Sequence, residues 1–271
     1  MSEDSIESQQ PLTGKRAIVC GSTRGIGRAC AFELAKVGAQ VTLLARDAQA
    51  LLRTRDDLSK ASWPTPEHDC LVADFTDPHQ VSRLAREYLE RSGPAHILIN
   101  NTGGPPSGSI LEAHPDAFLA AFGNHLLCNH LLAQAVIPGM KQAGYGRIIN
   151  IVSTSVKQPI AGLGVSNTVR GAVASWAKTL AGEVARHGIT VNNVLPGATR
   201  TDRLLAIIEH RAKSLGVTVH EVEHTMKSEI PARRFAEPEE IAAAVGFLAS
   251  PAASYITGVS LAVDGGRTNC L

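Results

Sequence analysis

The chain has 271 residues, of which 44% are hydrophobic, and this length suits one domain with one large core. Lys and Arg number 26, Asp and Glu number 25, and the formal net charge is +1. This balance gives no reason to expect a nucleic acid or an anionic membrane as partner.

Residues 1–11 are polar and acidic and lack the apolar stretch of a secretory signal, so we expect a disordered tail before a domain over residues 12–271. No apolar run approaches membrane-spanning length. The five cysteines contain no C-x-x-C pair, which is typical of small core residues in a reducing compartment. A cytoplasmic protein is therefore expected.

Short apolar runs alternate along the chain with stretches of helical spacing. Their nearly unbroken, β-branched character predicts buried parallel strands at Ala17–Cys20, Val41–Leu44, Cys70–Ala73, His96–Ile99, Arg147–Ile151, Thr190–Val194 and Val259–Val263. One helical stretch places an apolar stripe along Val169, Val173, Trp176, Leu180 and Val184. The alternation predicts an α/β fold, a single doubly wound domain whose parallel seven-stranded sheet carries helices on both faces.

The first predicted strand leads into a glycine-rich segment, Gly21-Ser-Thr-Arg-Gly25-Ile-Gly27, which a helix rich in Ala and Leu follows. Glycines there permit a tight turn and let the helix N-terminus approach a pyrophosphate. Glycine clusters also serve ordinary turns, but the position between a first strand and a helix favours a Rossmann-type dinucleotide site.

The second predicted strand ends at Arg46 and Asp47. An acidic residue here would bind the ribose of NAD, whereas an Arg accommodates the 2′-phosphate of NADP. Arg24 in the glycine loop adds a second cation, so NADP(H) is favoured and NAD(H) is the alternative. The competing interpretation makes Arg46 a solvated surface cation and Asp47 a helix cap.

A polar, His-rich segment at about residues 203–229 interrupts the strand–helix rhythm and predicts a small helical lid over the site. It contains His220-Glu-Val-Glu-His224, which matches the zinc-binding pattern H-E-x-x-H with Glu221 as general base. No third ligand follows at a suitable spacing, so we expect an amphipathic helix and no metal site.

The whole pattern from about residue 12 to 267 resembles the short-chain dehydrogenase/reductase family, with a general likeness to 3-oxoacyl-carrier-protein reductases. The similarity lies in the glycine motif G-x-x-x-G-x-G, in Asn100-Asn-Thr-Gly103 and in Pro196-Gly-x-x-x-Thr201. It implies cofactor contacts from Gly21, Ser22, Thr23, Arg24, Gly25, Ile26, Gly27, Arg46, Asp74, Phe75, Asn100, Thr102, Gly103, Arg170, Pro196, Gly197, Thr199 and Thr201. Asn124 and Ser153 fall at the family's catalytic Asn and Ser.

The resemblance fails at the family's Y-x-x-x-K motif. The Tyr follows the catalytic Ser by thirteen positions, which here is Ser166, and the Lys position is Arg170. A phenol with a pKa of about 10 can be tuned toward neutrality, whereas a serine hydroxyl is shorter and much less acidic. Arg170 still supplies positive charge and hydrogen bonds for the nicotinamide ribose but cannot easily pass on a proton.

No tyrosine is an evident substitute, because Tyr145 lies at the wrong end of the sheet, Tyr88 lies in a helix and Tyr255 precedes the last strand. Lys157, four residues after Ser153, is a candidate proton donor beside the cofactor, and its alternative is a solvated loop lysine.

Two functions remain open. The first is an NADP(H)-dependent oxidoreductase of a small-molecule carbonyl or alcohol, and the second is a catalytically silent NADP(H)-binding sensor or partner subunit. The resemblance also implies a homotetramer or dimer, since the family packs the helices corresponding to His114–Met140 and Asn167–His187 between subunits.

Overall fold

The computed structural model describes residues 10–61 and 67–270. Most of the predicted disordered tail, residues 1–9, lies outside the described residues. Within them, no helix combines the length and the apolar character that crossing a membrane requires.

Seven parallel strands form one sheet in the order β3-β2-β1-β4-β5-β6-β7, which confirms the predicted fold class. The strands are β1 (Arg16–Cys20), β2 (Gln40–Ala45), β3 (Asp69–Val72), β4 (Ile97–Asn100), β5 (Gly146–Ile151), β6 (Ile189–Pro196) and β7 (Ser260–Val263). The chain reverses its direction of winding between β1 and β4. In such sheets ligands bind in the crevice at the carboxyl ends of the strands on either side of that point.

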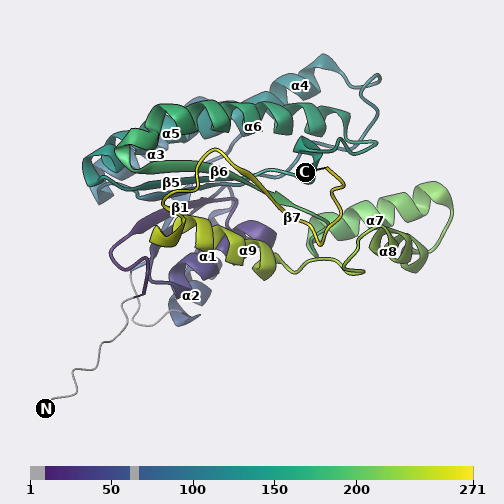
Figure 1. Cartoon of the computed structure of the whole chain (residues 1–271), viewed down its shortest axis with the longest axis horizontal. Coiled ribbons are helices and arrows are strands. Elements are labelled where there is room, and N and C mark those ends of the chain that lie inside the picture. The colour runs from purple at the N-terminus through teal and green to yellow at the C-terminus, as the bar shows by residue number, and fades with distance from the viewer. Residues whose placement is uncertain (1–9, 62–66, 271) are drawn as a thin grey trace, which may run out of the picture.

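Helices cover both faces of the sheet (Figure 1). They are α1 (Gly25–Lys36), α2 (Ala48–Ala61), α3 (Pro78–Ser92), α4 (Pro115–Phe122), α5 (Cys128–Ala143), α6 (Gly164–Val184), α7 (Asp202–Leu215), α8 (Val219–Ser228) and α9 (Pro238–Ala249). Short turns of other helix types occur at η1 (Gly123–Leu127), η2 (Thr154–Val156), η3 (Ala185–His187) and η4 (Pro251–Ala253).

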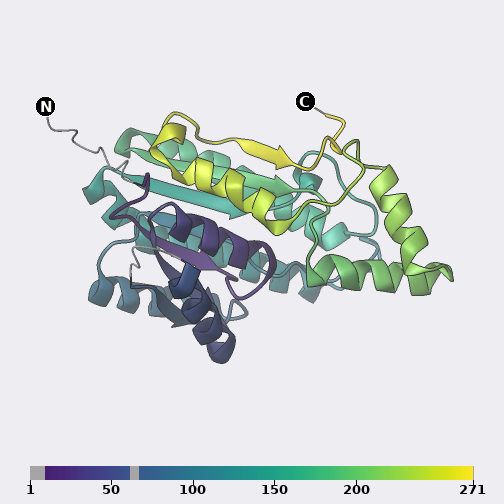
Figure 2. The ribbon, with the colours of Figure 1, turned by 90° about the horizontal axis from the view of Figure 1, so that it is seen from below.

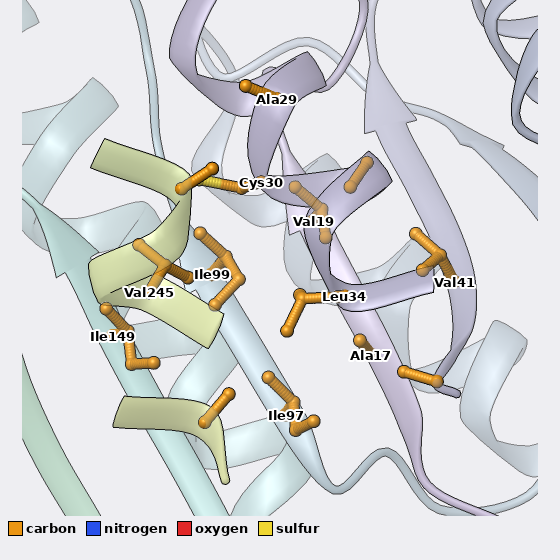
Figure 3. Packing of buried hydrophobic residues seen from close by; sticks show 14 of the residues in the cluster. Ala17, Val19, Ala29, Cys30, Leu34, Val41, Ile97, Ile99, Ile149 and Val245 are labelled. Carbon is orange, nitrogen blue, oxygen red and sulfur yellow. The ribbon is translucent and has the colours of Figure 1, made fainter. Parts of the chain in front are cut away.

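The core lies in two layers, one on each side of the sheet. Helices α1 and α9 run side by side across one face (Figure 2). Figure 3 shows Leu34 of α1 and Val245 of α9 beside Ile97 and Ile99 of β4, and all four side chains are fully buried. Helices α3, α5 and α6 build the second layer on the opposite face. Burial on both faces explains why the strand sequences are continuously apolar.

Helices α7 and α8 form a hairpin that projects from the body of the domain (Figure 1). They enclose a small apolar cluster of their own, which consists of Leu204, Ile208, Ala212, Val222, Met226, Ile230 and Phe235. The two ends of the hairpin are joined where Thr199 pairs with Ala236. This hairpin occupies the position of the predicted lid, and we call it the lid hairpin.

A row of buried polar side chains crosses the sheet close to the carboxyl ends of its strands. Asn100 Nδ2 donates to Asn150 Oδ1 at 2.9 Å, Asn150 Nδ2 donates to Asn193 Oδ1 at 2.9 Å, and Asn193 Nδ2 donates to Ser260 Oγ at 3.1 Å. The four residues are direct neighbours in the strand register. The row ties β4, β5, β6 and β7 together beside the crevice.

Replacing Asn150 by Leu is expected to lower the free energy of unfolding by about 3 kcal/mol, because two buried partners in Asn100 and Asn193 lose their hydrogen bonds. Urea unfolding measures this loss. A double-mutant cycle with Asn100→Ala is the control, since coupled residues give non-additive losses. Additive losses would show that the row contributes no joint stabilisation.

Candidate active site and cofactor site

The glycine loop after β1, residues 21–27, packs closely against Asn101 in the segment after β4. A Cβ atom on Gly27 would lie 2.2 Å from the Gly21 carbonyl oxygen, and one on Gly21 would lie 2.6 Å from the Asn101 carbonyl oxygen. Gly21 and Gly25 have φ angles of +60° and +53°, which favour glycine. The loop therefore leaves the start of α1 open to a pyrophosphate, as a dinucleotide requires.

Asn101 is a residue of this frame that sequence reasoning missed. Its Nδ2 donates to the carbonyl oxygens of Cys20 and Gly21 at 3.2 and 3.3 Å, which fastens the turn between β1 and α1. By contrast, the side chain of the neighbouring Asn100 lies in the buried polar row, so only its backbone can face a cofactor. The only sign of these two roles in the sequence is the pair of adjacent asparagines, Asn100 and Asn101.

The residues at the end of β2 fit a 2′-phosphate. Arg24 and Arg46 are exposed, and neither forms an ion pair with any described residue. Asp47 instead accepts a hydrogen bond from Ala50 N at 2.9 Å and so caps α2. Because the acidic side chain is used within the helix, the two cations favour NADP(H) over NAD(H).

Replacing Arg46 by Ala is expected to raise the Kd for NADPH about tenfold and to leave the Kd for NADH unchanged, since one charge-assisted bond to phosphate contributes about 1.5–3 kcal/mol. Quenching or enhancement of NADPH fluorescence measures both affinities. Arg83→Ala is the control, because Arg83 pairs with Glu87 on α3. Equal weakening of NADPH and NADH would contradict the phosphate contact.

Next to the predicted adenine contacts the chain forms a π-helical turn, η1, in which Asn124 lies. In the orientation that satisfies its neighbours, the Asn124 amide donates to the carbonyl oxygens of Phe75 and Ala120 at 2.7 and 3.3 Å. Asp74 Oδ1 meanwhile accepts a hydrogen bond from Thr76 N. The N–H groups of Asn124 are thus used inside the chain, and its predicted catalytic role rests on Oδ1 and the backbone.

The other predicted catalytic residues gather at the carboxyl end of β5, because α6 packs against both η1 and η2. Ser153 begins η2 and its Oγ accepts a hydrogen bond from Ser155 N at 3.1 Å. Ser166 is buried in the first turn of α6. One turn later, Arg170 donates from Nη1 to the Ile151 carbonyl oxygen at 3.1 Å. Lys157 ends η2 and is half-buried, and its ammonium contacts no described polar partner.

His125 is a second site residue that sequence reasoning missed. It follows Asn124 in η1, is 3% exposed, and shares a hydrogen bond of 2.5 Å between its Nδ1 and Thr102 Oγ1. Burial, with the nearby charges of Arg170 and Arg203, lowers the pKa of His125 to about 3, so the imidazole is neutral at pH 7. A histidine beside a motif Asn was the only signal in the sequence.

The lid hairpin begins directly over this cluster. Thr201 caps α7 by accepting a hydrogen bond from Leu204 N, and its Cγ2 would lie 3.2 Å from a Cβ on Gly25. Arg203 donates from its two Nη atoms to the carbonyl oxygens of Gly104 and Pro105 at 2.7 and 3.1 Å. The start of α7 therefore contacts both the glycine loop and the segment after β4.

Upstream of the lid hairpin, Gly197 packs so closely on β7 that an added Cβ would lie 2.7 Å from the Asp264 Cα. Thr199 Oγ1 donates to the Gly197 carbonyl oxygen at 3.1 Å. These contacts hold the segment from Pro196 to Thr201 at the carboxyl end of β6, where the resemblance predicts that it meets the nicotinamide.

The H-E-x-x-H match forms part of α8 and is a capping motif. The Glu221 carboxylate accepts hydrogen bonds from Thr218 N and Oγ1, both at 2.8 Å, and these bonds lower its pKa. His220 and His224 are exposed. No group of three metal-ligating side chains occurs among residues 10–61 and 67–270. Glu221 thus completes the capping box that Thr218 begins at the start of α8.

The tyrosines lie away from the cluster, as the sequence predicts. Tyr145 precedes β5 and its hydroxyl donates to the Ala249 carbonyl oxygen, while Tyr88 shares a hydrogen bond with Thr42 at 2.8 Å. Tyr255 is fully exposed after η4. Tyr145 and Ser153 lie at opposite ends of β5, and the hydroxyls of Tyr145 and Tyr88 are bonded to other parts of the chain.

Comparison with known proteins agrees with this geometry. Residues 21–268 match the family model described as enoyl-(acyl carrier protein) reductase. The chain is 34% identical over 256 residues to the 3-oxoacyl-[acyl-carrier-protein] reductase FabG of Vibrio cholerae, covering 94% of this chain and 98% of the relative. It is 30% identical over 255 residues to the NADPH-dependent reductase BacG of Bacillus subtilis, with 94% and 98% covered.

Among solved structures, the L-sorbose reductase of Gluconobacter frateurii complexed with NADPH and L-sorbose superposes with a TM-score of 0.90. That pair is 30% identical and covers 97% of this chain and 100% of the other. The NADPH named in this structure and in the BacG relative agrees with the cations at Arg24 and Arg46. The chain belongs to the short-chain dehydrogenase/reductase family.

Proposed function

We propose that the protein reduces the carbonyl group of a small molecule with NADPH, in an active site where Ser166 and Arg170 replace the family's Tyr and Lys. The observation that carries this proposal is the intact cofactor frame directly beside a cluster of polar side chains at the carboxyl end of β5. A frame of this kind positions a nicotinamide, and hydride transfer is the chemistry of the cofactor.

When bound, NADPH supplies a hydride to the carbonyl carbon, so the carbonyl and one proton become an alcohol and the cofactor becomes NADP⁺. The chain must orient the carbonyl and provide that proton. Ser153 Oγ, which accepts from Ser155 N, keeps its own O–H to donate to the carbonyl oxygen. The guanidinium of Arg170 supplies donors for the nicotinamide ribose, and the Lys157 ammonium is the candidate proton donor.

The alternative is an NADP(H)-binding protein without turnover, acting as a sensor or as a partner subunit. The replacement of both residues of the proton relay favours it, because a positioned general acid contributes about 10²–10⁴-fold to such a reaction. Cofactor binding alone does not separate the two functions, since both use the same frame.

Steady-state assays with NADPH and a panel of ketones, aldehydes and 3-oxoacyl esters test the proposal. Turnover that falls at least tenfold in both Ser153→Ala and Lys157→Met supports a reductase with this site. Tight NADPH binding without turnover of any panel member would favour the silent protein. If turnover falls in Ser153→Ala but not in Lys157→Met, the protein is still a reductase, but Lys157 is not its proton donor.

We also propose a homo-oligomer in which α4, α5 and α6 meet a second copy. Leu119 of α4 and Leu127 of η1 are 70% and 50% exposed, although both are large and apolar. Exposed apolar side chains of this size on consecutive helical segments are typical of a subunit contact. Light scattering coupled to size-exclusion chromatography measures the assembly, and a monomer at micromolar concentration would refute it.

A further inference from the structure

The cluster beneath the lid hairpin is rich in hydrogen-bond donors and positive charge. It consists of Arg170 on α6, Arg203 at the start of α7 and the neutral imidazole of His125 in η1. Burial and the charge of Arg203 lower the pKa of Arg170 to about 10, and burial lowers the pKa of Arg203. His125 bonds to Thr102, and Arg203 bonds to Gly104 and Pro105, so both side chains lie against the segment that follows β4. Both guanidinium groups remain charged at pH 7.

No carboxylate among the described residues offsets this charge. Several other arginines pair with a carboxylate: Arg200 pairs with Glu237, and Arg234 pairs with Glu240. Neither Arg170 nor Arg203 makes an ion pair within the described chain, and their bonds go to backbone carbonyl oxygens. Arg203 is exposed to solvent, whereas Arg170 is buried, and a buried guanidinium without a counter-ion is unfavourable unless a ligand supplies one.

Several hydrogen-bond donors of the cluster have no partner within the described chain. Arg170 is 9% exposed and uses one of its donor nitrogens, and His125 uses only Nδ1, among the described contacts. The fully enclosed polar atoms that lack a partner in the described chain are Asn100 Oδ1, Ser155 Oγ and Thr190 Oγ1. The free nitrogens of Arg170 and His125 are absent from that set, so they are not fully enclosed.

The segment that Arg203 contacts is also joined to the start of α6. Gly108 N donates to the Gly162 carbonyl oxygen at 2.7 Å, and Gly108 pairs with Leu163 just before α6. The segment after β4 thus connects Arg203, through Gly104 and Pro105, to the start of α6, the helix that carries Ser166 and Arg170. The anionic groups of the cofactor are already matched elsewhere, with the pyrophosphate at the start of α1 and the 2′-phosphate at Arg24 and Arg46.

We propose that the substrate of this reductase is an oxo acid, whose carboxylate binds Arg203 and His125 while its carbonyl lies at Ser153 and Arg170 remains at the nicotinamide ribose. The inference rests on the proposed carbonyl reduction and adds the substrate class. A planar guanidinium holds a carboxylate by two parallel hydrogen bonds, and the imidazole adds a neutral donor when its Nδ1 accepts from Thr102.

Matched pairs of substrates test this inference: 2-oxo and 4-oxo acids, each beside its methyl ester. In the wild type, kcat/KM for the acid is expected to exceed that for the ester at least tenfold. Arg203→Gln should bring the ratio close to one by lowering kcat/KM for the acid alone, and Arg203→Lys should restore part of it. NADPH fluorescence titration should give the same Kd for all three proteins.

Three outcomes would overturn the inference. Esters reduced as well as the acids would show that no carboxylate is recognised, while the proposed carbonyl reduction would stand. If Arg203→Gln lowers kcat/KM equally for the acid and the ester, Arg203 only connects α7 to Gly104 and does not bind the carboxylate. A weaker Kd for NADPH that accounts for the whole loss would assign Arg203 to the cofactor. Reduction of neither series would instead count against the proposed function.

Discussion

Replacing Gly27 by Ala is expected to abolish tight NADPH binding, raising Kd about a hundredfold or more. The new Cβ would lie 2.2 Å from the Gly21 carbonyl oxygen and 2.6 Å from Asn101 Nδ2, so the glycine loop must move away from α1. Misplacing binding groups by about 1 Å can cost about 10²-fold. Overpacking of this kind also lowers the free energy of unfolding by about 1–3 kcal/mol.

Fluorescence titration with NADPH and urea unfolding separate the two effects. Gly182→Ala in α6 is the matched control, because a Cβ there meets nothing within 4 Å. That change is expected to leave the Kd for NADPH unaltered and to add about 0.5–1 kcal/mol of helix stability. If Gly27→Ala folds and binds NADPH like the wild type, the close approach of glycine loop and helix is not what positions the pyrophosphate.

The features that the sequence predicts well are those whose signal is local. Each strand is a short apolar run, and the observed strands differ from the predicted ones by one or two residues at their ends. The glycine loop reads directly as a turn between strand and helix. The cap formed by Asp47 involves only Ala50, three residues later in the chain. Because the two residues are so close in sequence, the sequence alone already offers this role for Asp47.

The features that the sequence does not reveal depend on long-range packing. Arg203 contacts Gly104 and Pro105, about a hundred residues earlier in the chain, and nothing in the local sequence pairs them. His125 lies in a π-helical turn at Gly123–Leu127, and its imidazole bonds to Thr102, 23 residues earlier in the chain. Such a turn has no reliable residue signature, so a buried histidine there cannot be distinguished from a core histidine.

The same contrast explains the interpretation of the H-E-x-x-H pattern. Its spacing suits a metal site, but Thr218 three residues before Glu221 is an equally local signal for a capping box. The structure shows the capping box. A motif match therefore gains meaning only from what surrounds it, whereas the missing Y-x-x-x-K motif is visible in the sequence itself.

Restoring the family's proton relay by the double substitution Ser166→Tyr/Arg170→Lys is expected to raise kcat/KM for a neutral ketone about a hundredfold. A positioned general acid contributes about 10²–10⁴-fold, and an adjacent ammonium lowers the pKa of a phenol from about 10. Ser166 and Arg170 lie one turn apart on α6, which preserves the spacing of the motif. Steady-state oxidation of NADPH with a methyl ketone measures the gain.

The pH profile of the double variant provides the sharper readout, because a phenolic acid should give an alkaline limb that persists when Lys157 is replaced by Met. Ser166→Phe/Arg170→Lys is the matched control, since it adds the same ring without the hydroxyl and should give no gain. A double variant that binds NADPH with wild-type affinity and yet gains nothing would show that Ser166 does not face the carbonyl. The donors beneath the lid hairpin would then set the position of the substrate, and the phenol at position 166 would not reach its carbonyl oxygen.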